Sequence, residues 1–230
     1  MGIVVDHHRF LELYHEFGAE LEMLHTLYLD SLAGYSLLHN QVQERQSSFS
    51  AALGESECAT ETFQNTCSIS YMDVSGQSFE PVSMLPNMRQ GDMKQRTEED
   101  GPNSLRLGAL CVVSLYSYWE EYLRIEIGKA MGVLLSDAKN DEATKDILNK
   151  HVKYDVWGDL RFFRHSILHA NGVANSEFSR CKKITWFQPG DKIELTYEKV
   201  RKIFLLLASF RNELHSLSFP PRKGIRVPSV

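Results

Sequence analysis

A sustained heptad pattern near the N-terminus constrains the fold more than any other feature of this sequence. Between Phe10 and Val42, alternating steps of four and three residues reach ten positions, of which nine are apolar or aromatic. Residues at this spacing share one face of an α-helix. The pattern predicts a long amphipathic helix over residues 6–46, or two helices with a bend near Gly34. Further leucines widen its apolar face, so it is expected to pack against more than one neighbour; these are Leu11, Leu13, Leu27 and Leu32.

Helical periodicity returns in the second half of the chain. Residues 105–131 are apolar nearly all round, which is typical of a central helix. A shorter helix is expected over 141–153, and another from Asp155 to a stop at Asn171 and Gly172. A last amphipathic helix follows Thr196. With so little strand signal, the sequence predicts an all-α fold built as a helical bundle.

The segment between these helical regions has a different composition. Residues 47–104 contain ten serines, four glycines and three prolines, which predicts a long irregular connection with few local elements. Alternation at Cys67, Ile69 and Tyr71 suggests one short strand there. A short β-hairpin or turn is expected around 187–191, and residues 219–230 are expected to form a flexible tail of a single domain spanning 1–230.

Composition excludes several classes of protein. With 43% apolar and 24% charged residues, the chain is expected to fold as a globular protein. Its longest apolar run, 203–208, is far shorter than the about 20 residues of a membrane span. No secretory signal is visible, and the four cysteines show no CxxC spacing. We therefore expect a cytoplasmic protein with reduced thiols and no membrane partner.

Charge is distributed unevenly along the chain. Residues 1–150 carry 11 basic and 23 acidic residues, a net charge of −12, whereas residues 151–230 carry 14 and 7, a net charge of +7. This asymmetry points either to an anionic partner of the C-terminal part or to attraction between the two parts of the chain.

The predicted helix before Asn171 contains the candidate catalytic residues. Arg161, His165 and His169 recur at i, i+4 and i+8 and form one ridge, and Arg164 borders it. Arginine matches phosphate oxygens with its planar fork, and histidine can donate or accept a proton at neutral pH. A base, an acid and a cation suffice to cleave RNA through its own 2′-hydroxyl. The competing interpretation is a solvated basic face that caps the end of the helix.

Histidines take part in two other arrangements in this sequence. His165 and His169 have a spacing that can bind zinc, but the sequence shows no obvious third ligand. Arg211 and His215 imitate the motif, yet they lie beside an apolar stripe and are expected on the polar side of a core helix.

At Arg164–His169 the sequence resembles the HEPN (higher eukaryotes and prokaryotes nucleotide-binding) superfamily. The motif of that family is an arginine, four to six residues and a histidine, often with a polar residue directly after the arginine. Here four residues separate Arg164 from His169, and His165 takes the polar position, where the family most commonly has asparagine. Asn171-Gly172 and the later stretch PGDKIELT add to the resemblance, which is clearest over residues 155–215.

The resemblance implies a metal-independent endoribonuclease with no cofactor, whose site forms between two copies of the chain. It gives His169 the role of general base or acid, Arg164 that of phosphate ligand, and His165 that of orienting the site or sharing proton transfer. Such proteins often act as bacterial toxins or antiviral effectors, with an antitoxin or effector-complex partner. The candidate substrate-binding residues are Arg161, Asn171, Lys182 and Lys183.

Two alternatives remain open at this point. Other members of the superfamily have lost catalysis and bind RNA, nucleotides or proteins. The heptad-bearing first helix also fits a helical interaction protein that assembles through it.

Overall fold

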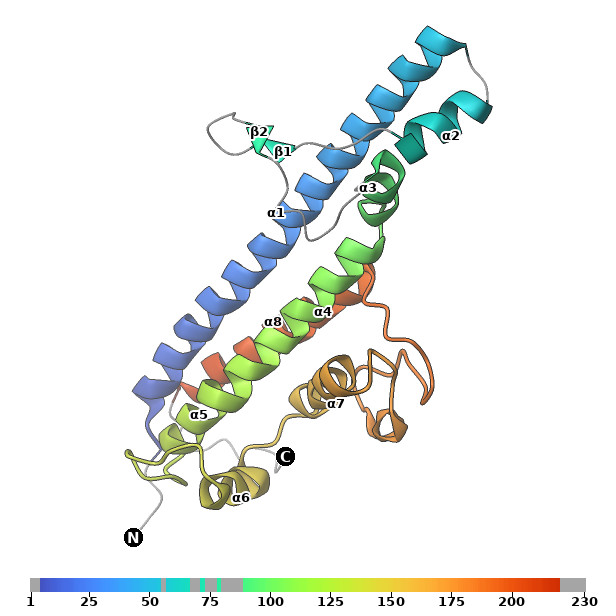
Figure 1. The fold of residues 1–230 in the computed structure, drawn as a ribbon. Coiled ribbons are helices and arrows are strands. Elements are labelled where there is room, and N and C mark those ends of the chain that lie inside the picture. Colours follow the sequence, from blue (N-terminus) through green and yellow to red (C-terminus); the bar gives the residue numbers. More distant parts are fainter. Residues whose placement is uncertain (1–4, 55–56, 67–70, 73–77, 80–88, 220–230) are drawn as a thin grey trace. The chain divides into compact units, whose positions relative to one another are not determined.

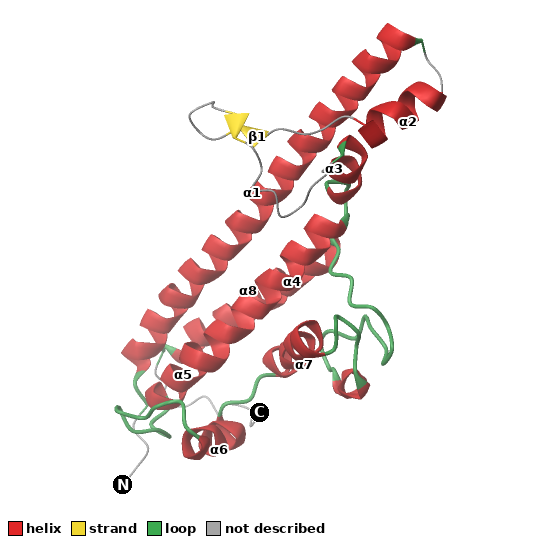
Figure 2. Cartoon of the chain, in the orientation of Figure 1, coloured by secondary structure: helices red, strands yellow, loops and turns green. Residues whose placement is uncertain are grey.

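The computed structural model describes residues 5–54, 57–66, 71–72, 78–79 and 89–219, and its fold is all-α (Figures 1 and 2). Two two-residue strands, β1 (Tyr71–Met72) and β2 (Ser78–Phe79), pair antiparallel with Tyr71 opposite Phe79. None of the described helices is both long and apolar enough to cross a membrane. The helices are α1 (His7–Leu53), α2 (Glu57–Thr66), α3 (Gln90–Arg96), α4 (Pro102–Tyr118), the π-helical η1 (Trp119–Leu123), α5 (Arg124–Ala130), α6 (Glu142–His151), α7 (Asp155–His169), the 3₁₀-helical η2 (Ser176–Arg180) and α8 (Tyr197–Leu217).

The chain divides into two compact units. One contains Met1–Leu27 and Gly108–Val230, and the other contains Tyr28–Leu107. Because α1 and α4 each run through a boundary, the expected single domain stays a prediction.

Helix α1 confirms the heptad prediction, with corrections. It runs from His7 to Leu53 as one helix, so the alternative of two helices divided near Gly34 is wrong, as is the expected end near residue 46. One glycine costs a helix only about 1 kcal/mol, too little to interrupt so long an apolar stripe. Leu13 is fully buried, but Leu11 and Leu27 lie exposed, so the packed face is narrower than predicted.

The segment expected to be irregular, 47–104, contains more helix than its composition suggests. Helices α2 and α3 lie within it, and the end of α1 and the start of α4 extend into it. Val42, Phe63 and Met93 form a small buried cluster, which explains why α2 and α3 fold here. Of the expected strand, Tyr71 belongs to β1, whereas residues 67–70 lie outside the described part of the chain, as do 220–230 of the expected tail.

Aromatic packing fixes α7 in the unit that contains Gly108–Val230. The rings of Trp119 and Trp157 stack with centroids 4.7 Å apart and an interplanar angle of 3°. Phe210 of α8 and Phe17 of α1 contact Trp157 edge-on, at 5.5 Å and 5.9 Å. Trp157, on the buried side of α7, therefore holds that helix against α1, η1 and α8.

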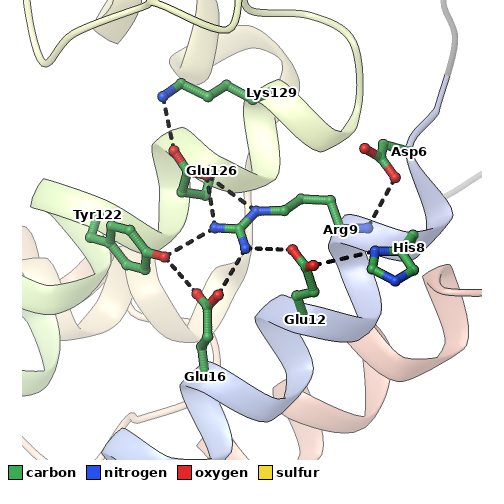
Figure 3. A network of polar contacts seen from close by, with 8 residues as sticks. All are labelled: Asp6, His8, Arg9, Glu12, Glu16, Tyr122, Glu126 and Lys129. Atoms are coloured by element: carbon green, nitrogen blue, oxygen red, sulfur yellow. Dashed lines mark hydrogen bonds and ion pairs between the residues drawn. The ribbon is translucent and has the colours of Figure 1, made fainter.

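A network around Arg9 joins the start of α1 to η1 and α5 (Figure 3). The guanidinium of Arg9 contacts the carboxylates of Glu12, Glu16 and Glu126, each at 2.8 Å. Tyr122 bridges the network by accepting a hydrogen bond from Arg9 and donating one to Glu16. Because Tyr122 and Glu126 lie 113 and 117 positions from Arg9 in sequence, the network joins the two sequence segments of this unit.

Of the short β-hairpin or turn expected around 187–191, the structure contains the turn, closed by Asp191 N–H donating to the Gln188 carbonyl at 3.0 Å, but not a hairpin. Residues 190–193 instead pair with the segment after α7: Ala174 N–H donates to Asp191 at 2.8 Å, and Ile193 N–H donates to Gly172 at 2.7 Å. Gly172 and Gly190 adopt positive φ angles of 73° and 98°. These turns bring two distant segments together, so the nearest neighbour in sequence is not the pairing partner.

Candidate functional site

Helix α7 carries the candidate site and folds as its sequence predicts. Leu160, Phe163 and Ser166 are fully buried, whereas Arg161, His165 and His169 lie on the exposed face. Asn171 has a φ of 51°, and Gly172 N–H donates to the Ser166 carbonyl at 2.9 Å, which ends the helix. The predicted ridge is thus confirmed as one exposed stripe along α7.

The two histidines of the ridge lie side by side. The ring centroids of His165 and His169 are 5.2 Å apart, with an interplanar angle of 49°. Both side chains are exposed, so a ligand can reach both imidazoles at once. Such a pair can supply one proton acceptor and one proton donor to the same ligand.

Arg164 has a different environment from its neighbours on the ridge. Its side chain is half-buried, and its guanidinium lies over the ring of Tyr116 on α4, 5.9 Å from the ring centroid. Its Nε is buried with no hydrogen-bond partner among the described residues. The charge is therefore held in place by packing and remains free to bind an anion.

Asp159 is a residue that sequence reasoning missed. This buried carboxylate accepts hydrogen bonds from three successive backbone N–H groups, those of Lys182, Lys183 and Ile184, at 2.7–3.1 Å. It anchors the basic segment after η2 to the first turns of α7. A signal existed in the sequence, because an aspartate on the apolar side of an amphipathic helix requires a polar partner.

The anchored segment places the predicted lysines near α7 by different means. The Lys182 ammonium pairs with Asp155 at 2.7 Å, and this contact raises the pKa of Lys182. Lys183 is exposed, and only its backbone contacts Asp159. Asn171 is exposed at the end of the helix, and its observed role there is in the backbone turn. Substrate binding by Lys182, Lys183 and Asn171 stays a prediction.

Arg211 and His215 lie elsewhere, against α1. Arg211 Nε donates to the Tyr14 carbonyl at 3.1 Å, and its guanidinium lies 4.1 Å from the centre of the Tyr14 ring. The ring of His215 lies 4.8 Å from that of Tyr14. These contacts confirm that both residues belong to the polar side of a core helix.

Candidate metal ligands are not clustered in the part of the chain that the structure describes. There, no group of three or more His, Cys, Asp or Glu side chains is placed to hold a metal ion. His165 and His169 accordingly have no third ligand of these types within the described residues.

The sequence matches no family model, and no curated protein or solved structure is significantly similar to it. The resemblance at Arg164 and His169 therefore rests on the motif and its setting in this chain.

Proposed function

We propose that this protein is a metal-independent endoribonuclease whose site is built on the ridge of α7. The observation that carries the proposal is the pair of exposed imidazoles of His165 and His169, 5.2 Å apart, beside the packed guanidinium of Arg164. Phosphodiester cleavage needs a base, an acid and a cation near one phosphate, and this surface offers all three.

The reaction is internal to the RNA. One imidazole removes the proton of a 2′-hydroxyl, and the resulting oxygen attacks the adjacent phosphorus. Arg164 stabilises the added negative charge on the phosphate oxygens, as a guanidinium fork does. A second imidazole, in its protonated form, acts as the general acid and donates its proton to the departing 5′-oxygen. The products are a 2′,3′-cyclic phosphate and a free 5′-hydroxyl, and DNA, which lacks the 2′-hydroxyl, is not cleaved.

We assign His169 the main proton-transfer role, and His165 a role in orienting the site or sharing that transfer. The family resemblance favours a homodimer in which two α7 ridges face one another and form a composite site. It also favours action in the cytoplasm as a toxin or antiviral effector, under the control of an antitoxin or effector-complex partner.

A cleavage assay on mixed cellular RNA in the presence of EDTA tests this function. Wild-type protein is expected to produce fragments ending in cyclic phosphate, and His169→Ala and Arg164→Ala are expected to abolish them. His151→Ala serves as the matched control, since His151 is exposed at the end of α6 and is not part of the ridge on α7. Cleavage that survives His169→Ala in a nuclease-free preparation would contradict the proposal.

The second candidate is an RNA-binding module without catalysis. The basic segment anchored by Asp159 favours it, because Lys183 and the exposed Arg161 can bind phosphates with no chemistry. RNA binding by wild type that is weakened by Lys183→Gln, with no cleavage of any RNA, would support this candidate.

A further inference from the structure

A pocket of about 530 Å³ opens beside the N-terminal half of α7. Its walls come from α4 and η1, the start of α5, the end of α6 and the segment around η2, all within one compact unit. Arg161 lines it, but Arg164, His165 and His169 do not. The pocket is therefore a separate feature from the histidine pair, although both adjoin the same helix.

Two arginines of the pocket are held by one aromatic ring. The guanidinium carbons of Arg161 and Arg180 lie 5.0 Å and 5.6 Å from the centre of the buried Phe162 ring. Stacking on a fixed ring restricts each long side chain before any ligand arrives. Residues 19 positions apart (161 and 180) thus present two planar donors to one cavity.

A third arginine, Arg124, also lines the pocket, and its hydrogen-bond partners among the described residues are neutral. It donates to the Val152 carbonyl at 3.2 Å and to the Asn149 side-chain oxygen at 2.9 Å, which are both neutral. Burial lowers the pKa of Arg124, and the nearby Arg161 lowers it further, against the opposing effects of Tyr116 and Glu120. A half-buried charge with neutral partners is costly, and an incoming anion would offset that cost.

The acids of the pocket are already engaged. Asp155 pairs with Lys182, and Asp159 is occupied by three backbone N–H groups. Glu177 reaches Arg180 only at 3.6 Å, with both side chains exposed, so this pair neutralises little. The pocket consequently keeps a net positive charge that its own carboxylates do not satisfy.

We propose that this pocket binds the phosphate of a nucleotide-sized ligand, held by Arg124, Arg161 and Arg180. Its volume lies within the range of about 300–1,000 Å³ typical of small-molecule sites. Tyr116, Trp119 and Tyr154 supply aromatic wall, which suits a base better than a bare inorganic ion. This goes beyond the ribonuclease proposal, because it assigns a second ligand to residues outside the histidine pair.

Isothermal titration of the full chain with AMP, adenosine and inorganic phosphate tests the proposal. AMP is expected to bind at least about tenfold more tightly than either fragment, because each fragment makes only half of the contacts. Arg180→Gln and Arg161→Gln are expected to weaken AMP binding by about tenfold or more. Arg201→Gln is the matched control, as Arg201 is exposed on α8 and 3.7 Å from Glu198.

Each other outcome overturns the proposal. If AMP does not bind, or binds Arg180→Gln as tightly as wild type, the pocket is not a phosphate-binding site. Equal affinity for AMP and inorganic phosphate would show that the ligand is not a nucleotide. Binding of a short RNA but not AMP, weakened by Arg180→Gln, makes the pocket part of an RNA surface instead. His169→Ala is expected to bind AMP normally even if cleavage is lost, so the two proposals fail independently. Thermal unfolding of each variant confirms that it is folded.

Discussion

The carboxylate of Asp159 accepts a hydrogen bond from the backbone N–H of Lys183, 24 residues further along the chain, at 2.7 Å. The same carboxylate binds the N–H groups of Lys182 and Ile184. An acid in the first half of α7 thereby sets the path of the basic segment. Asp159 thus keeps Lys182 next to α7, and Lys182 is one of the residues that line the arginine pocket.

Replacing Asp159 is expected to be costly. Asp159→Asn keeps the size of the side chain, but it replaces one of the two carboxylate oxygens that accept from the N–H groups with an NH₂ group, which can only donate. Leaving buried donors unsatisfied should lower the free energy of unfolding by about 2–3 kcal/mol, measured by urea denaturation. Asp155→Asn is the control, because Asp155 is exposed and forms its ion pair at the surface. The free energy of unfolding of this variant should be nearly that of wild type. Equal loss in both variants would contradict the anchoring role.

The Arg9 network should contribute to stability. Arg9 and Glu126 are only 22% and 19% exposed, so Glu126→Gln leaves a poorly solvated guanidinium with a weaker partner. The free energy of unfolding should fall by about 1–2 kcal/mol, or roughly 2–8 °C in melting temperature. Glu142→Gln, which removes a carboxylate that is 91% exposed, should change neither quantity appreciably. A network with no energetic role would give the two variants the same melting temperature.

The same network predicts acid sensitivity. Burial alone raises the pKa of Glu126, but hydrogen bonds from Lys129 and Arg9 outweigh it and lower the pKa below the ordinary 4.5. At Glu16, burial likewise raises the pKa. Hydrogen bonds from Tyr122 and Arg9 outweigh this effect and lower the pKa of Glu16. Because the folded pKa is the lower one, the stabilisation is complete above 4.5 and is lost as the pH falls through the folded value. Unfolding free energies measured from pH 7 to 3 should show this decline, and Glu126→Gln should flatten it. Parallel curves for the two proteins would refute the assignment.

Gly108 is required by close packing of α4. A Cβ there would lie 2.7 Å from Val200 Cγ2 and 3.0 Å from the Leu195 carbonyl oxygen. Gly108→Ala should therefore destabilise the protein by about 1–3 kcal/mol, despite the better helix propensity of alanine. Gly34→Ala, where a Cβ meets nothing within 4 Å, should instead stabilise it by about 0.5–1 kcal/mol. Thermal denaturation of both variants checks the opposite signs, and a stabilised Gly108→Ala would show that the helices can move apart.

The two histidines of the ridge should respond differently to substitution. If His165 orients the site, His165→Asn should keep cleavage within about tenfold of wild type, because asparagine can still position a phosphate. His169→Ala should lose about 10²–10⁴-fold, the usual contribution of a general acid or base. Rates on one fluorescent RNA substrate separate the roles. A larger loss for His165→Asn than for His169→Ala would reverse the assignment.

The sequence alone predicted the features that depend on helical periodicity. The buried stripe of α1, the exposed ridge of Arg161, His165 and His169, and the end of α7 shortly before Asn171 all follow from residues within a few turns of one another. Such features are local, because the 3.6-residue repeat and the turn residues act over short distances. The family resemblance at Arg164 and His169 is of the same kind and stays a prediction.

Only the tertiary structure decided which distant residues meet. Composition predicted a long irregular connection over 47–104, but packing around Phe63 made part of it helical. A hairpin or turn was expected around 187–191; the turn is present, but residues 190–193 pair with the segment after α7 rather than with a neighbouring strand. No local sequence pattern indicates that Tyr116 supports Arg164. The same holds for the pocket that brings together three arginines, Arg124, Arg161 and Arg180. Each of these contacts joins separate elements, and its free energy is gained only after the helices have packed.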